Sequence, residues 1–174
     1  MRFVVLRLVP HPDSPCRAVE RIEVRIERRP AGRLALAYRL QGDLAKVRIP
    51  ALRPPTFADD LWQGTCFEAF TRAQGPSYHE FNFSPSGEYA AYRFDAYRSG
   101  RTKLEEPLQV RTSTLAGDWV LECEIPAPED AVLALSAVIE EAGGLAYWAL
   151  RHAPGKPDFH HPDAFAMRLD EIRD

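Results

Sequence analysis

The sequence predicts an all-β protein, an antiparallel β-sandwich of the jelly-roll type. Hydrophobic residues recur with a period of two rather than 3.6, as in strands that bury one face. About ten strand-like segments follow one another at intervals of roughly 8–15 residues, without alternating helices, which is the spacing of sandwiches and jelly rolls. A length of 174 residues fits one domain. We therefore expect a single domain over residues 1–174.

The strongest strand signal lies at residues 19–27, where Ile22, Val24 and Ile26 share one face and charged residues occupy the other. The same alternation returns after the turn residues 30–32 and runs through residues 34–40, and residues 44–49 form a further candidate strand. Three prolines make residues 50–60 a loop. The remaining predicted strands cover residues 65–72, 78–83, 88–94, 108–113, 119–125, 131–139 and 145–152.

Composition excludes several classes of protein. The net charge is −3 and no basic block interleaves with aromatic residues, so we expect no nucleic-acid partner. No apolar run reaches the roughly 18 residues that cross a bilayer, and the first ten residues are too short and interrupted for a signal peptide. We expect no membrane partner and a cytoplasmic location. Three widely spaced cysteines argue against a disulfide framework or a zinc knuckle, and Cys66 and Cys123 should be buried as small hydrophobes.

The most informative segment is the predicted hairpin over residues 78–94. Its turn is Ser84-Pro85-Ser86-Gly87, in which proline suits the second position and glycine the fourth. With Pro85 and Ser86 as the two central residues, Glu80 faces Ala91 and Tyr78 faces Arg93. The hairpin then has a core face made of His79, Phe81, Phe83, Ala90 and Tyr92, and a second face made of Tyr78, Glu80, Asn82, Tyr89, Ala91 and Arg93.

The second face has the chemistry of a binding surface. It combines aromatic rings with a carboxylate, an amide and a guanidinium, and sugars need both kinds of group because their C–H faces stack on rings while their hydroxyls donate and accept hydrogen bonds. Alternation in the preceding strand places Glu68 where it can join this face, with Trp62 at the strand's entry. A simpler interpretation is a cross-strand ion pair between Glu80 and Arg93.

Four segments also resemble a known group of domains: residues 61–68, residues 78–87, the Tyr147-Trp148 strand and residues 162–165. Together they resemble the DOMON-like, family 9 carbohydrate-binding-module-like bacterial domains, over about residues 57–169. The resemblance implies a β-sandwich jelly roll with a ligand slot. Such slots occur both in sugar-binding modules and in haem-binding redox domains.

In the sugar-binding branch of that group, two tryptophans clamp a terminal sugar while glutamate, arginine and asparagine side chains bond its hydroxyls. The resemblance implies that Trp62 is the first aromatic with Glu68 as its acid, Trp148 the second aromatic, and Arg93 the arginine. Residues 142–147 lack the asparagine expected before the second tryptophan. The predicted ligand-binding set is Trp62, Glu68, Tyr78, Glu80, Asn82, Arg93, Trp148 and His160, with a small molecule, most simply a sugar, as the partner and no catalytic residue.

A metal or haem site is a competing hypothesis. Residues 151–163 hold three of the five histidines, so His152, His160 or His161 with Asp163 are candidate ligands, although their spacing fits no established zinc pattern. Ordinary loop hydrogen bonding is the default for this segment, which can also cover one edge of the slot. Haem needs axial Met or His ligands, and Met167 is the one methionine beyond Met1. We therefore expect no cofactor and no metal.

An enzyme and a protein-interaction module are two more hypotheses. Glu68 and Glu80 are a candidate carboxylate pair for glycoside hydrolysis, but nothing in the sequence isolates one of them to raise its pKa. No other catalytic motif is present. An aromatic face that meets another protein is also consistent with the sequence, and binding of a free monosaccharide would separate the two binding hypotheses.

Overall fold

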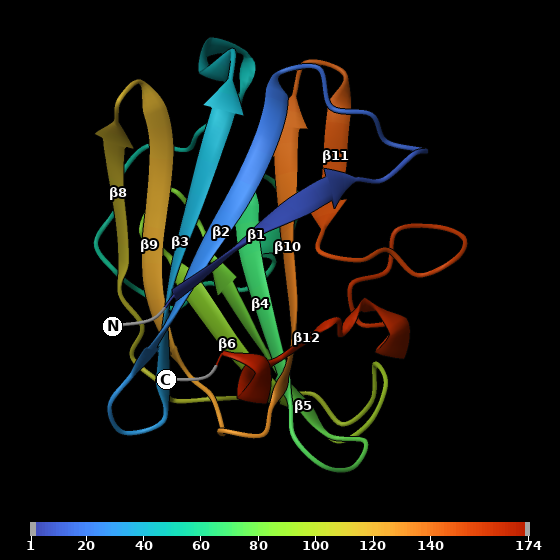
Figure 1. Cartoon of the computed structure of the whole chain (residues 1–174). Helices are drawn as coiled ribbons and strands as arrows, with labels where there is room; N and C mark the ends of the chain where they lie inside the picture. The colour runs from blue at the N-terminus through green and yellow to red at the C-terminus, as the bar shows by residue number, and fades with distance from the viewer. Residues whose placement is uncertain (1–2, 173–174) are drawn as a thin grey trace.

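The computed structural model describes residues 3–172, and nearly all of its regular structure is antiparallel β-strand, which confirms the predicted all-β class (Figure 1). Its helices are four single 3₁₀ turns, and no helix in this range is long and apolar enough to span a membrane. The 3₁₀ turns are η1 (Leu44–Lys46), η2 (Leu61–Gln63), η3 (Pro162–Ala164) and η4 (Leu169–Glu171). The strands are β1 (Phe3–Pro10), β2 (Val19–Arg29), β3 (Arg33–Gly42), β4 (Cys66–Arg72), β5 (Tyr78–Phe83), β6 (Tyr89–Phe94), β7 (Thr102–Lys103), β8 (Val110–Leu115), β9 (Asp118–Pro126), β10 (Val132–Glu141), β11 (Gly144–Ala149) and β12 (Met167–Arg168).

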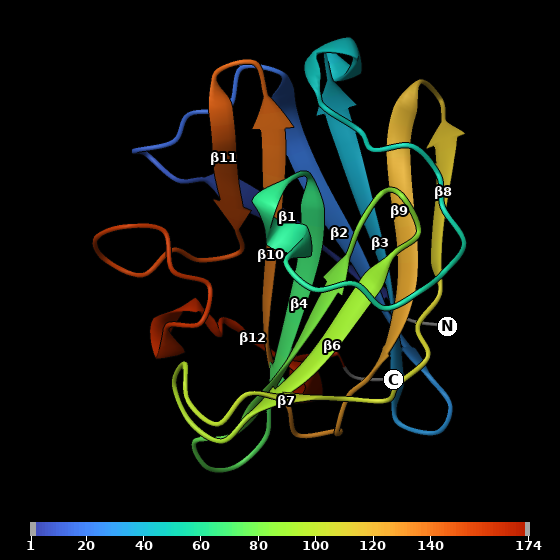
Figure 2. The ribbon, with the colours of Figure 1, turned by 180° about the vertical axis from the view of Figure 1, so that it is seen from behind.

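The strands form one curled sheet with two layers, in the order β7-β6-β5-β4-β10-β11-β1-β2-β3-β9-β8, and β12 pairs with β10. Strand β1 connects the layers because its residues 3–8 pair with β2 while Val9 and Pro10 pair with β11. We call the layer of β1, β2, β3, β9 and β8 sheet A. Sheet B holds β7, β6, β5, β4, β10, β11 and β12. Figures 1 and 2 show β1 crossing between the two layers.

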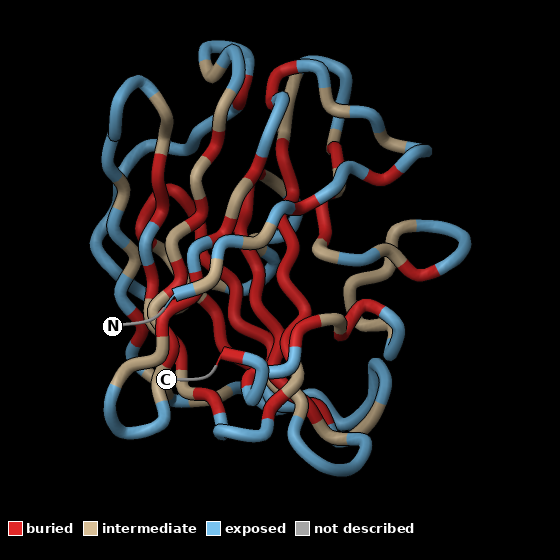
Figure 3. Tube along the Cα trace, viewed as in Figure 1, coloured by how far each residue is buried: buried red, intermediate tan, exposed pale blue. Residues whose placement is uncertain are grey.

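The main core lies between the layers, as the alternation predicts (Figure 3). Ile22, Val24 and Ile26 of β2 are completely buried there. Strand β3 contributes Tyr38, whose hydroxyl donates a 2.7 Å hydrogen bond to the Glu68 carbonyl oxygen on β4. This bond crosses the core and fixes the backbone of the strand that carries Glu68.

Sheet B is also buried on its outer face. A second hydrophobic cluster there joins strands β4, β5, β6 and β10 to the loop before β12. Its buried members are Phe70, Tyr78, Ala90, Tyr92, Phe94, Ala134, Ala164 and Phe165. The outer face of the central hairpin is therefore covered by chain segments rather than open to solvent along its whole length.

Two predicted elements need correction, and one long strand was not predicted. Residues 44–49 are not a strand: η1 occupies residues 44–46, where Lys46 bonds Asp43 at 2.8 Å, and Val47 makes one isolated bridge. Strand β1 was not predicted, since most of its side chains are exposed or half-exposed and give no clear buried face. Strand β11 ends at Ala149, because the chain turns so that His152 reaches the Val9 carbonyl oxygen at 2.8 Å.

The cysteines follow the prediction. Cys66 and Cys123 are buried, Cys16 is partly buried, and all three are free thiols.

Candidate ligand-binding site

Three polar side chains rise side by side from the outer face of sheet B. Alternation along β4 and β5 directs Glu68, Glu80 and Asn82 to this face, and the two strands pair so that Glu68 lies opposite Asn82. Each side chain is at least nine-tenths buried. From β10, Ser136 lies opposite Glu68 and donates a 3.3 Å hydrogen bond to its Oε2. These residues form the polar floor of a pocket.

The pocket over this floor has a volume of about 630 Å³. Its walls come from η2, β6, the loop after β6, β11 and the loop that follows β11. The aromatic members are Trp62, Tyr92, Phe94, Tyr147 and Phe159, and the charged or polar members are Asp60, Glu68, Glu80, Asn82, Arg98, Arg101, Lys156 and His160. Trp62 is 47% exposed, so it forms part of the mouth of the pocket. A pocket of this size with an aromatic wall and a few convergent polar groups is typical of small-molecule sites.

The predicted register of the β5–β6 hairpin is wrong by one residue. The expected turn exists, since Gly87 N–H donates to the Ser84 carbonyl at 3.0 Å, but Ser84 N–H also donates to the Glu88 carbonyl at 2.9 Å. The loop therefore has three residues, and the third, Gly87, has a φ of +96°. A type I turn followed by a left-handed glycine is the usual three-residue hairpin loop.

This slip exchanges the two faces of β6. Glu80 lies opposite Tyr92 rather than Ala91, and Tyr78 lies opposite Phe94 rather than Arg93. Tyr92 and Phe94 thus face the pocket. Arg93 faces the other side together with His79, is exposed, and bonds Asp95. The predicted place of Arg93 in the site and its ion pair with Glu80 are both contradicted.

Arg98 and Arg101, from the loop after β6, supply the guanidinium groups that line the pocket. Arg98 bonds Asp158 at 2.8 Å, which ties the loop after β6 to the loop after β11. Arg101 stacks over the ring of Tyr92, with its guanidinium carbon 4.9 Å from the ring centroid. The hydroxyl of Tyr92 in turn donates to Asp59.

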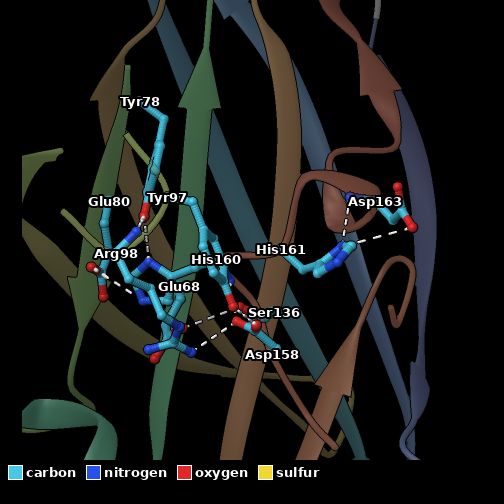
Figure 4. Close-up of polar contacts among 10 residues, drawn as sticks. All are labelled: Glu68, Tyr78, Glu80, Tyr97, Arg98, Ser136, Asp158, His160, His161 and Asp163. Carbon is cyan, nitrogen blue, oxygen red and sulfur yellow. Dashed lines mark hydrogen bonds and ion pairs between the residues drawn. The ribbon is translucent and has the colours of Figure 1, made fainter. Parts of the chain in front are cut away.

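His160 is held at the edge of the floor, as Figure 4 shows. Its Nδ1 lies 2.8 Å from the Tyr78 hydroxyl, its Nε2 lies 3.8 Å from Glu80 Oε2, and its ring packs edge-on against Phe70 and Phe94. Tyr78 itself lies in the second cluster beneath His160 and also accepts from the Arg98 backbone N–H at 3.2 Å. Tyr78 therefore positions His160 and is not among the residues that line the pocket.

Burial sets the protonation of the two carboxyl groups. It raises the pKa of Glu68 to about 8, with a further rise from the nearby Glu80 charge, while the Ser136 hydrogen bond and Arg98 act in the opposite direction. Burial also raises the pKa of Glu80, and the Asn82 hydrogen bond and the charges of Arg101 and Arg98 oppose this rise. At neutral pH Glu68 is therefore mainly protonated. The expectation that neither carboxyl group lies in surroundings that raise its pKa is therefore wrong.

His160 is neutral beside this pair. Burial lowers its pKa to about 4, and Arg98 lowers it further, against an opposing effect of Asp158. A neutral imidazole 3.8 Å from Glu80 forms no ion pair, so His160 supplies no counter-charge to the carboxyl groups of the floor.

The second predicted tryptophan lies outside the pocket. Trp148 is 2% exposed and packs in the main core, because β11 alternates and pairs Trp148 with the core residue Ala137. Its neighbour Tyr147 points to the opposite face, pairs with Val138 and lines the pocket. The strand was predicted, but the face was assigned to the wrong aromatic residue.

The structure thus brings five of the eight predicted residues to one pocket: Trp62, Glu68, Glu80, Asn82 and His160. Tyr78 supports His160, whereas Arg93 and Trp148 lie elsewhere. Sequence reasoning missed Tyr92, Phe94, Arg98, Arg101, Tyr147 and Phe159. Only Tyr92, Phe94 and Tyr147 carried a signal, namely the alternation of their strands.

The histidine-rich loop does not gather its predicted metal ligands. His152 packs against His11 on β1's side of the molecule, His160 enters the pocket, and His161 accepts a hydrogen bond from the backbone N–H of Asp163. Figure 4 shows His161 and Asp163 apart from the pocket residues. Within residues 3–172, no three His, Cys, Asp or Glu side chains are placed to hold a metal ion. The haem hypothesis fits no better, since Met167 packs in the main core.

A second depression, of about 680 Å³, lies between η1 and the β10–β11 turn. Its residues include Lys46, Arg48, Glu140 and Glu141, which are largely engaged with one another or with neighbouring backbone. It lacks an aromatic wall and a buried polar floor. The pocket on sheet B is therefore the stronger candidate.

Comparison with known proteins supports the fold. No protein-family profile matches the sequence, and no curated protein matches it. Among solved structures, the chain is similar to the crystal structure of a proposed carbohydrate-binding protein from Bacteroides uniformis, with a TM-score of 0.65 and 19% sequence identity. The similarity covers 95% of this chain and 84% of that one. The two proteins therefore share a β-rich fold over nearly the whole chain.

Proposed function

We propose that the pocket on sheet B binds a carbohydrate without transforming it. The observation that carries this proposal is the buried floor of Glu68, Glu80 and Asn82 in a pocket whose walls contain aromatic rings. A pyranose presents apolar C–H faces that stack on rings such as Trp62 and Tyr147. Its hydroxyl groups both donate to and accept from carboxyl and amide groups.

The structural similarity supports the same class of ligand, because the protein from Bacteroides uniformis is itself proposed to bind carbohydrate. We further propose kinship with the DOMON-like and family 9 carbohydrate-binding domains. It is supported by the Trp62–Glu68 segment and by the ligand pocket on the outer face of a β-sandwich.

A glycosidase is less well supported, even though Glu68 has the raised pKa of a general acid. Hydrolysis needs two carboxyl groups that flank one glycosidic bond. Glu68 and Glu80 rise from adjacent strands of the same sheet face, so they approach a ligand from one side. Binding without turnover is the better match to this geometry.

The proposal is tested by isothermal titration and thermal shift of the full chain with monosaccharides and short oligosaccharides. We expect a ligand whose affinity falls by about 1–3 kcal/mol in Trp62→Ala, the usual scale for loss of an aromatic anchor, and is largely retained in Trp62→Phe. Leu52→Ala is the control, since Leu52 is 78% exposed and outside the pocket. Equal loss in the control, or no sugar bound by the folded protein, would refute the proposal, and release of free sugar from an oligosaccharide would show an enzyme.

A further inference from the structure

The floor of the pocket contains more hydrogen-bond acceptors than donors. Asn82 Nδ2 donates to Glu80 Oε1 at 2.9 Å, which leaves Asn82 Oδ1 buried without a hydrogen-bond partner in the described part of the chain. Ser136 donates to Glu68 Oε2, and no group in residues 3–172 donates to Glu68 Oε1. A ligand group rich in donors would satisfy this site.

The two carboxyl groups of the floor also have no direct cationic partner among the described residues. Within residues 3–172, no lysine or arginine forms an ion pair with Glu68 or Glu80. Arg98 is engaged by Asp158 and Arg101 stacks on Tyr92, so both arginines act on Glu80 from a distance rather than through a direct pair. Lys156 and Asp60 complete the charged residues of the wall, and the buried His160 is neutral. The buried carboxyl groups of the floor therefore favour a positive ligand group, while the cationic residues Arg98, Arg101 and Lys156 are exposed.

The wall suits such a group as well. Five aromatic side chains line the pocket, and the faces of aromatic rings attract ammonium ions. A neutral sugar hydroxyl offers a single donor and no charge. A protonated amine offers three donors, no acceptor and a positive charge, which together meet the deficits of the floor.

We propose that the ligand is an amino sugar, whose protonated amine lies on the floor between Glu68, Glu80 and Asn82. This inference rests on the proposed function, and it names the class of sugar that the pocket selects. In the free protein the proton that Glu68 retains at neutral pH takes the place of the amine. Binding of the ammonium group would release that proton to solvent.

The test compares glucosamine, galactosamine and mannosamine with glucose, galactose, mannose and the three N-acetyl derivatives, by isothermal titration at pH 6–7. We expect at least one amino sugar to bind about tenfold or more tightly than its parent hexose and its N-acetyl form. Titrations in two buffers of different ionisation enthalpy should report release of about one proton per ligand bound.

Two variants locate the amine. Glu80→Gln and Glu68→Gln should each reduce the preference for the amino sugar over the hexose to within about twofold, since each removes a charged acceptor. Glu105→Gln is the matched control, because it removes the same charge from an exposed loop outside the pocket. Melting temperatures of all three variants show whether they fold.

The outcomes separate this inference from the proposed function. Equal or tighter binding of a parent hexose would overturn the amine and leave carbohydrate binding intact. Binding of no sugar at all would overturn both. A divalent cation could also raise the melting temperature in the absence of sugar. If that rise were lost in Glu68→Gln, the inference would be overturned and the floor would be assigned to a metal.

Discussion

Glu80 lies directly opposite Tyr92 across the β5–β6 hairpin, and both side chains face the same pocket. This pairing places a buried carboxyl beside an aromatic ring over which Arg101 stacks. It also directs Arg93, the next residue along β6, to the opposite face of the sheet. The chemistry of the site therefore depends on a single residue in the hairpin loop.

Glu80→Gln and Arg93→Gln should have different effects on ligand binding. We expect Glu80→Gln to weaken binding about tenfold, since it removes a charged acceptor from the floor. Arg93→Gln should change affinity by less than about twofold, because its exposed pair with Asp95 contributes little and lies outside the pocket. Titration with the tightest-binding sugar checks both, and an equal loss in the two variants would contradict the pairing of Glu80 with Tyr92.

Tyr147→Ala and Trp148→Ala should separate binding from stability. Tyr147 lines the pocket, so its removal should reduce ligand affinity by about 1–3 kcal/mol with a small change in melting temperature. Trp148 fills the main core, so its removal should lower the free energy of unfolding by about 3–5 kcal/mol. Urea unfolding and titration on each protein measure the two effects. A large loss of stability in Tyr147→Ala would place that ring in the core instead.

Glu68→Gln should stabilise the protein at neutral and alkaline pH. The folded state raises the pKa of Glu68 from 4.5 to about 8. The stability that the protonated Glu68 side chain contributes to the folded state is therefore fully present below pH 4.5 and is lost as the pH rises toward 8. Glutamine stays neutral at every pH and loses no stability in this way. At pH 7 the free energy of unfolding of Glu68→Gln should therefore exceed that of the unchanged protein by on the order of 3 kcal/mol. Unfolding curves between pH 4.5 and 8.5 check this. A difference between the two proteins that does not grow with pH would contradict the buried, protonated state of Glu68.

His160 should make the protein sensitive to acid. The folded state lowers the pKa of His160 from 6.5 to about 4. The stability that the neutral imidazole contributes to the folded state is therefore present above pH 6.5 and is lost as the pH falls toward 4. His160→Gln should lose less stability over this range, by up to about 3 kcal/mol. His161→Gln is the control, since His161 is more exposed and lies outside the pocket. If the two variants respond to acid in the same way, the burial of His160 is not the cause.

The strands were largely predictable because their alternation is a direct consequence of burying one face. The same reasoning correctly placed Glu68, Glu80 and Asn82 on one face of sheet B. It failed at β6, where the turn residues were identified but the loop length was taken as two residues rather than three. A glycine at the end of a type I turn is compatible with both lengths, and only the longer loop brings Tyr92 and Phe94 into the second cluster.

Most residues of the pocket walls were beyond sequence reasoning for a different reason. Arg98, Arg101 and Phe159 come from loops without hydrophobic periodicity, and contacts between distant loops place them. The bond between Arg98 and Asp158 joins residues 60 positions apart. No local pattern specifies such a contact, whereas the face of a strand follows from its immediate neighbours.

The crossing of β1 between the two layers has a consequence for self-association. Since β1 continues sheet B into sheet A, the path of strands in residues 3–172 ends at two outer strands, β7 and β8. β7 has two residues and includes Lys103, and most of β8 is polar and exposed. Long apolar edges invite a strand from another molecule, whereas short, charged or polar edges discourage it. The two strands at the ends of the path are thus poor templates for a strand from another molecule.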